Sequence, residues 1–126
     1  MAELKGDFFN KEEIRSHDKR LSYINAFLPK LIETAKRKTL GFKENLEAIN
    51  PKDIKTVEDL QMIPVLRKSE LSNKQKLFPP FGGFERTEQQ NTTHFFQSPG
   101  PIYEPGTRGS DWGRFAPLLY STGVRK

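Results

Sequence analysis

The sequence predicts a mainly α-helical domain with a short β element, which places it in the α+β class. Apolar residues recur at spacings of three and four in the first part of the chain, as they do on one face of a helix. One stretch, Thr92–Phe96, is rich in residues that favour strands. The chain has 126 residues, of which 34% are hydrophobic, so we expect one modest core to which the ten Phe contribute.

The first helix is expected to begin at Asn10, whose side chain suits an N-cap, with Glu12 and Glu13 in the first turn. Pro29 lies inside the helical pattern and should kink or split the helix, because its ring removes a hydrogen bond and clashes with the preceding turn. The apolar face of this helix consists of Ile14, Leu21, Ile24, Leu28, Leu31 and Ala35, widened by Phe27 and Ile32.

The basic run Lys36–Lys38 suits the end of this helix, which Gly41 is expected to terminate. We interpret the run as a solvated helix end. The net charge of +5 permits an anionic partner such as nucleic acid, lipid headgroups or a phosphorylated ligand without requiring one. A second, shorter helix is indicated by Phe42, Leu46 and Ile49.

Cap and turn signals organise the next part of the chain. Asn50–Pro51 predicts a helix start, with Asn as the cap and Pro at the first helical position. Thr56–Asp59 resembles a capping box with Asp in place of Glu, and the short helix after it should end before Pro64. Ser69–Leu71 is expected in another short helix.

Two stretches rich in Pro and Gly are expected to be loops. Phe78–Phe84 is pinned by its aromatic side chains, which either pack on the helices or form a partner surface. Ser98–Gly106 follows the strand as a tight loop.

A final helix is expected to start at Ser110 as its cap, with Asp111 in the first turn. Pro117 implies a bend or an early stop in this helix, and Gly123 ends it. One side of the helix carries Trp112, Phe115, Leu118 and Leu119.

No catalytic constellation and no metal site is recognised in the sequence. Absence of Cys excludes disulfides and Cys-ligated zinc. His17 and His94 lack metal-ligand spacing; His17 is expected on the surface, whereas His94 precedes the loop and is a candidate to face a substrate. No apolar run reaches the ~18 residues that span a bilayer, and the N-terminus lacks a signal-peptide core, so we expect a cytoplasmic protein without a membrane partner.

Several of these pieces occur in a recognisable order. Asn50–Leu60 is followed by Ile63–Pro64 and Arg67–Leu71, and then by a strand, a Gly-containing turn and a helix that ends at Ser121–Val124. The ordered set resembles the start of the phenylacetate-CoA ligases, a branch of the adenylate-forming acyl-CoA synthetase superfamily. The resemblance extends over roughly residues 8–126.

The resemblance implies the N-terminal helical segment of an adenylate-forming enzyme. Such an enzyme activates a carboxylate with ATP and Mg²⁺ and then transfers the acyl group to coenzyme A. The family's adenine pocket, acid pocket and lysine-bearing lid lie downstream of this segment. We therefore expect these 126 residues alone to be inactive and to need no cofactor. Their expected partner is the remainder of the ligase, or further copies of the chain, reached through exposed apolar surface.

The same resemblance divides the chain into three regions. These are a helical region at 1–77, a loop region with a short strand and a degenerate phosphate-loop position at 78–109, and a helix at 110–126 that leads into an α/β domain. The family's phosphate loop is rich in Ser, Thr and Gly, ends in Gly-Lys-Pro, and cradles ATP phosphates with N–H groups and hydroxyls. Ser98, Gly100 and Tyr103 are the candidate cofactor-binding residues at this position.

Three residues in this loop depart from the family pattern, although Ser98, Gly100 and Pro105 match it. Pro101 and Ile102 replace Thr residues, and Pro101, like Pro99 before it, lacks the backbone N–H that a phosphate would use. Glu104 replaces the Lys and would repel phosphate oxygens. Either the loop handles phosphate differently or it has lost that role, in which case it is a rigid connection between strand and helix.

The alternative function is a non-catalytic interaction module, either a degenerate ligase homologue or a small basic adaptor for an acidic partner. Glu104 favours degeneracy. A nucleic-acid-binding module ranks third, because the aromatic residues lie away from the basic run at Lys36–Lys38. A truncation, a proteolytic remnant and one piece of a split enzyme are all compatible with the sequence.

Overall fold

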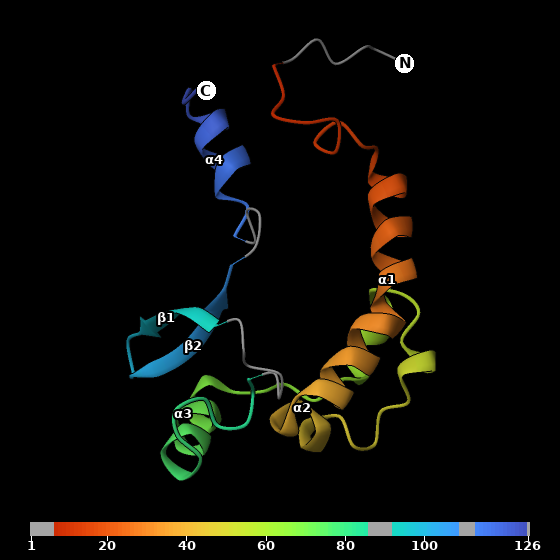
Figure 1. The fold of residues 1–126 in the computed structure, drawn as a ribbon. Helices are drawn as coiled ribbons and strands as arrows, with labels where there is room; N and C mark the ends of the chain where they lie inside the picture. Colours follow the sequence, from red (N-terminus) through yellow and green to blue (C-terminus); the bar gives the residue numbers. More distant parts are fainter. Residues whose placement is uncertain (1–6, 86–91, 109–112, 126) are drawn as a thin grey trace. The chain divides into compact units, whose positions relative to one another are not determined.

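A computed structural model describes residues 7–85, 92–108 and 113–125 (Figure 1). It confirms the α+β class, since helices predominate and the strands of the described residues form one two-stranded antiparallel sheet. In chain order the elements are α1 (His17–Lys38), α2 (Leu40–Asn45), two 3₁₀ helices (Pro51–Asp53 and Glu58–Met62), α3 (Lys68–Leu77), β1 (Thr92–Ser98), β2 (Ile102–Thr107) and α4 (Phe115–Ser121).

The chain divides into two compact units, which are described separately. The core unit comprises residues 23–108, and the terminal unit joins residues 1–22 with residues 109–126.

Helix α1 begins at His17, so the predicted start near Asn10 is wrong. The Asn10 side chain does accept a hydrogen bond from the backbone two residues on, at 3.0 Å, but this bond closes a turn and not a helix. Ser16 supplies the cap, because its Oγ accepts the N–H of Lys19 at 3.3 Å.

Pro29 was predicted to kink or split the first helix. Helix α1 runs through Pro29 without a break, so it is not split there. Leu28 and Ile32, on either side of this proline, are both buried. Their packing offsets the roughly 3 kcal/mol that proline costs inside a helix.

The core of the larger unit lies where α1 meets the segment after it. Much of the predicted apolar face is not buried, however, and Ile24, Phe27 and Leu31 are 37%, 49% and 48% exposed. The buried cluster consists of Leu28, Ile32, Leu46, Ile49 and Ile54, with Ala35, Phe42, Val57 and Ile63 packed against it.

Lys36 is tied to the core unit and is not a freely solvated helix end. Its Nζ donates to the carbonyl oxygens of Glu47 at 2.9 Å and of Ile49 at 2.8 Å. A cation thus satisfies two backbone acceptors that follow α2, which fixes the end of α1 against that segment.

Gly41 lies inside α2 and does not terminate α1, contrary to the prediction. A Cβ at this position would come within 2.8 Å of the Phe84 ring, and the Gly41 N–H donates to the Gly83 carbonyl at 2.7 Å. Glycine is therefore required for close approach of two chain segments. Thr39 caps α2 by accepting the Phe42 N–H at 3.3 Å.

The predicted Asn50 cap is confirmed, whereas the capping box at Thr56–Asp59 forms only on its Asp59 side, because Val57 and not Thr56 precedes the second 3₁₀ helix. Asn50 caps the first 3₁₀ helix, which starts at Pro51. The Asp59 carboxylate accepts the N–H groups of Lys55 at 2.9 Å and Thr56 at 2.8 Å. These backbone hydrogen bonds, with that of Lys55 the largest cause, lower the pKa of Asp59.

Helix α4 begins at Phe115, later than predicted; Ser110, Asp111 and Trp112 lie outside the described residues. Pro117 is the third residue of this helix, and it fits there because N–H groups of the first turn have no helical partner. Gly123, with φ of +97°, follows the end of α4 as predicted.

Candidate functional site

The predicted phosphate-loop segment is a β-hairpin. β1 and β2 pair antiparallel, with Ser98 opposite Ile102, so only residues 99–101 form the turn. The prediction of a loop over 98–106 is therefore wrong from Ile102 onward, and the turn joins two strands, not a strand and a helix. The physical reason is burial near both ends of β2: Ile102 is 2% exposed, and Gly106 is buried against the Phe96 ring.

Ser98, Gly100 and Tyr103 all lie in or beside the turn of this hairpin, but the side chains of Ser98 and Tyr103 do not converge. Residues directly opposite in an antiparallel pair share a face, and successive residues alternate. Ser98 therefore shares a face with Ile102, whereas Tyr103 pairs with Gln97 on the other face. Gly100, with φ of +139°, lies in the turn between them.

The backbone of Tyr103 is already engaged by a side chain of α3. Gln75, which is 6% exposed, accepts the Tyr103 N–H at 2.9 Å and donates to the Tyr103 carbonyl at 2.7 Å. The Tyr103 N–H is thus not available to a phosphate in this conformation. Its assignment to cofactor binding stays a prediction that rests on its phenol.

Glu104 lies in β2 opposite Phe96 and is exposed, on the same face as Ser98. The Glu104 carboxylate therefore lies on the same face of the hairpin as the Ser98 hydroxyl. For an incoming phosphate this is an unfavourable neighbour, as the sequence indicated.

Aromatic side chains join the hairpin to the loop before it. Phe81 is 3% exposed and stacks on Phe95 with ring centroids 5.8 Å apart. Phe84 meets Phe42 edge to face at 5.1 Å. Phe78, however, is 67% exposed. The 78–84 loop therefore both packs and presents an aromatic surface.

The two histidines lie on the surface. His94 is exposed in β1, where its Nδ1 is 2.8 Å from the Thr93 hydroxyl and its ring stacks on Phe96. His17 is exposed at the start of α1. Among the described residues, no group of three or more His, Asp or Glu is placed to hold a metal ion.

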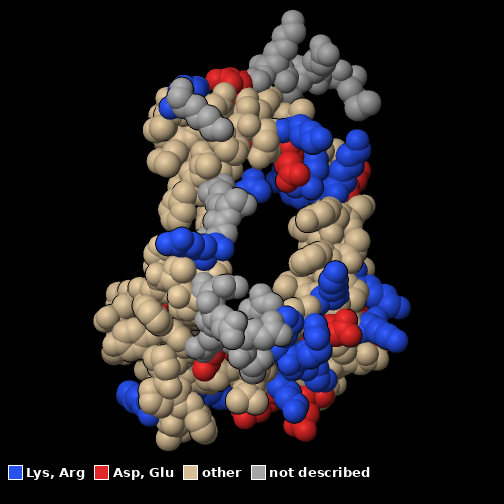
Figure 2. Space-filling view, viewed as in Figure 1, with Lys and Arg blue, Asp and Glu red and all other residues tan. Residues whose placement is uncertain are grey.

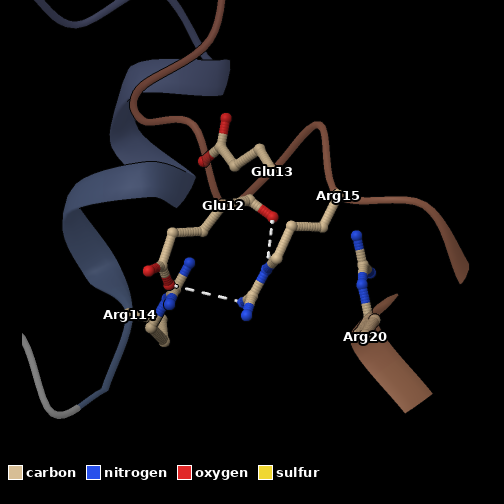
Figure 3. A pocket seen from close by; sticks show the side chains of 5 residues that line it. All are labelled: Glu12, Glu13, Arg15, Arg20 and Arg114. Carbon is tan, nitrogen blue, oxygen red and sulfur yellow. Dashed lines mark hydrogen bonds and ion pairs between the residues drawn. The ribbon is translucent and has the colours of Figure 1, made fainter. Parts of the chain in front are cut away.

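A second candidate site lies in the terminal unit and was not predicted. Glu12, Glu13, Arg15, Arg20 and Arg114 line a pocket of about 430 Å³ (Figure 3). Sequence reasoning missed it because Arg114 is distant in the chain and neither Arg15 nor Arg20 belongs to a basic run. The only signal of this pocket in the sequence was the mixture of acidic and basic residues between Glu12 and Arg20.

Contacts around Asp7 hold the two parts of the terminal unit together. The Tyr120 hydroxyl donates to Asp7 Oδ1, and the Arg125 guanidinium donates to Asp7 Oδ2 at 2.9 Å. Phe9 packs edge to face on Tyr120, with centroids 5.6 Å apart. The Tyr120 hydrogen bond, followed by the charge of Arg125, lowers the pKa of Asp7, and Asp7 in turn raises the pKa of Tyr120.

Charge on the surface shown in Figure 2 is distributed, with Lys and Arg in several separate groups and Asp and Glu among them. A nucleic-acid module would favour a continuous basic stripe with exposed aromatics. In the described part of the chain, no helix has the length and apolar character needed to cross a membrane.

The chain has the fold of a segment of an adenylate-forming CoA ligase. No family model and no curated protein matches it. Solved structures to which it is similar include those of 2-hydroxyisobutyryl-CoA ligase. In the postadenylation state with 2-HIB-AMP, that protein matches 86% of this chain with a TM-score of 0.76 and 23% identity. In the thioesterification state with 2-HIB-AMP and CoA, it matches 99% of this chain with a TM-score of 0.81 and 19% identity.

The matched part is a minority of the larger protein. This chain covers 24% of the ligase in the first structure and 28% in the second. The chain thus spans about a quarter of the length of the structures it matches.

Proposed function

We propose that this chain is the N-terminal segment of an ATP-dependent acyl- or aryl-CoA ligase and is inactive without the remainder of that enzyme. The observation that carries the proposal is the similarity over 99% of this chain to a quarter of a CoA ligase. The ordered segments from Asn50 to Leu71 further support the phenylacetate-CoA ligase-like branch. The cytoplasm remains the expected location.

At the phosphate-loop position, the described residues do not fit a nucleoside triphosphate on their own. At the phosphate-loop position the turn offers the Ser98 hydroxyl and the Gly100 N–H, while Pro99 and Pro101 have no N–H to donate. Tyr103 donates its N–H to Gln75, and the described residues hold no carboxylate cluster for Mg²⁺. We therefore assign ATP, Mg²⁺ and coenzyme A to the whole enzyme and no chemical step to this segment.

The proposed partner is the remainder of the ligase, which would cover the exposed face of α1. Tyr23, Phe27 and Leu31 follow each other at intervals of four and therefore lie along one side of this helix. Their exposure, between 48% and 60%, is large for apolar side chains of one helix face. Self-association of the isolated chain through this face is the alternative outcome.

ATP–pyrophosphate exchange tests the proposal. The purified 126-residue chain is expected to give no exchange with any carboxylic acid, because the acid and adenine pockets are outside it. The gene product purified from its natural source, with its mass determined, is expected to extend beyond Lys126 and to catalyse exchange with at least one acid. Exchange by the 126-residue chain alone would refute the proposal.

One observation favours a non-catalytic module as the second candidate. The hairpin carries two prolines and Glu104 where the family has phosphate donors and Lys. A gene product from the natural source that extends beyond Lys126, yet gives no ATP–pyrophosphate exchange with a broad panel of acids, would support a degenerate ligase homologue.

A further inference from the structure

The pocket in the terminal unit brings together three arginines and two glutamates from segments far apart in the sequence. Glu12, Glu13 and Arg15 precede α1, Arg20 lies in its first turns, and Arg114 is the residue before α4. In the view of Figure 3 the guanidinium of Arg15 lies between those of Arg20 and Arg114.

Both carboxylates of the pocket already have partners. Glu12 Oε2 forms an ion pair with Arg15 Nη2 at 3.4 Å, and the Glu12 carbonyl accepts Arg15 Nε at 3.2 Å. Glu13 Oε2 accepts the Phe9 N–H at 3.1 Å. The guanidinium groups of Arg20 and Arg114 have no such partner among the described residues. The pocket therefore has a net positive charge, and two of its cations are left to bind an anion.

The position of Arg114 is fixed by contacts within the terminal unit and does not depend on a ligand. Arg114 has φ of +55°, and it starts the helix that the Asp7–Tyr120 and Asp7–Arg125 contacts hold against the N-terminal segment. A left-handed backbone is uncommon for a residue other than Gly, so a structural reason is expected where it occurs. Here it directs the chain from residue 113 into α4 while Arg114 lines the pocket.

We propose that this pocket binds a small oxyanion of the phosphate class with two or more negative charges. Arginine forms paired, charge-assisted hydrogen bonds to phosphate oxygens, and two unpaired guanidinium groups match a multiply charged anion better than a single carboxylate. The volume, about 430 Å³, exceeds that of one phosphate and lies within the range of small-molecule sites. Pyrophosphate and the phosphate groups of a nucleotide share this chemistry.

This proposal is independent of the function proposed above, because it rests on the terminal unit alone and concerns binding, not catalysis. Failure of ATP–pyrophosphate exchange would leave it standing, and failure of anion binding would leave the ligase proposal standing.

Calorimetric titration of the 126-residue chain with sodium pyrophosphate at low ionic strength tests the proposal. Saturable binding is expected, which Arg20→Gln and Arg114→Asn each weaken about tenfold or more, the loss expected for one charged hydrogen-bond donor. Asn suits the left-handed backbone at 114. Glu12→Gln should tighten binding, because it removes a negative charge from the pocket.

Arg37→Gln is the matched control, since Arg37 is an exposed arginine of α1 outside the pocket. It should change the affinity less than twofold, whereas Arg20→Lys should retain part of the binding. Circular dichroism confirms that each variant is folded. Competition titrations with ADP and with adenosine show whether the pocket recognises phosphate groups or the nucleoside. ADP, but not adenosine, should compete with pyrophosphate.

Three results would overturn the proposal. These are no saturable binding of pyrophosphate at millimolar concentration, equal weakening by Arg37→Gln and Arg20→Gln, and competition by adenosine alone. The second result would mean that only overall charge attracts the anion.

Discussion

Gln75 and Tyr103 are joined by two hydrogen bonds, at 2.7 Å and 2.9 Å, through which an amide side chain of α3 pairs with β2 as a neighbouring strand would. The amide donates to the Tyr103 carbonyl and accepts the Tyr103 N–H, so both groups on this edge are satisfied. A two-stranded hairpin is marginal by itself, and this contact with α3 is part of what holds it in the core unit.

Replacement of Gln75 by Leu should therefore destabilise the core unit. The expected loss is about 1–3 kcal/mol, because a buried amide is removed and two backbone groups of Tyr103 lose their partner. Urea unfolding measures the free energy. Asn73→Leu, at an exposed position of the same helix, is the control and should change stability by less than about 0.5 kcal/mol. Equal losses in the two variants would show that the Gln75 contact adds nothing.

A methyl group at Gly41 should be costly because of the Phe84 ring. Gly41→Ala is expected to lose about 1–3 kcal/mol, since its Cβ would lie within 2.8 Å of that ring. The clash predicts strong coupling: in Phe84→Leu background the same substitution should cost less. Thermal or urea unfolding of the four proteins in this double-mutant cycle measures the coupling. Additive losses would contradict the clash.

Lys36→Met should destabilise the core unit by about 1–2 kcal/mol, because two backbone carbonyls lose a charged donor. Lys30→Met is the matched control, as Lys30 is exposed in the same helix. Urea unfolding of both variants compares them under identical conditions. A Lys36 variant as stable as the Lys30 variant would show that the basic run is solvated after all.

The terminal unit should become less stable in acid, because the contribution of the ionised Asp7 carboxylate is lost. The pKa of Asp7 is lower in the folded protein than its ordinary value of 3.8, chiefly because Tyr120 donates to it and then because Arg125 is near. Its contribution to stability is therefore present above the ordinary value and is lost as pH falls through the lower, folded value. Carboxyl NMR titration should show the depressed pKa of Asp7.

Two variants separate the causes of this shift. Tyr120→Phe should raise the pKa of Asp7 more than Arg125→Gln does, because the Tyr120 hydrogen bond is the larger cause. In Asp7→Asn the pKa of Tyr120 should fall toward its ordinary value of 10.0, which ultraviolet titration of tyrosinate measures. An Asp7 that titrates at its ordinary value would disprove the contact.

Local chemistry was predictable from the sequence where a residue acts on its own neighbours. Asn50 and Asp59 bond to N–H groups within four residues, so their caps follow from short-range geometry. Asn10 offered the same signal and formed a turn, because Ser16 provides a second cap ahead of the apolar positions. Local signals thus indicate a cap and do not choose between competing ones.

The second strand of the hairpin shows where such signals are insufficient. Ile102–Thr107 contains Pro105 and Gly106, which are typical of loops, yet it pairs with β1 because Ile102 is buried and Gln75 holds Tyr103. Burial and a partner in another helix outweigh local preference here.

The sequence by itself determined the helical character, the Asn50 cap and the proline-bounded turn, because each depends on residues a few positions apart. Only the tertiary structure decided that Gln75 completes the edge of β2, that Gly41 admits the Phe84 ring, and that Arg114 joins Arg15 and Arg20 around one pocket. These relationships connect residues that are distant in the chain, and their free energy exists only once packing has brought the segments together.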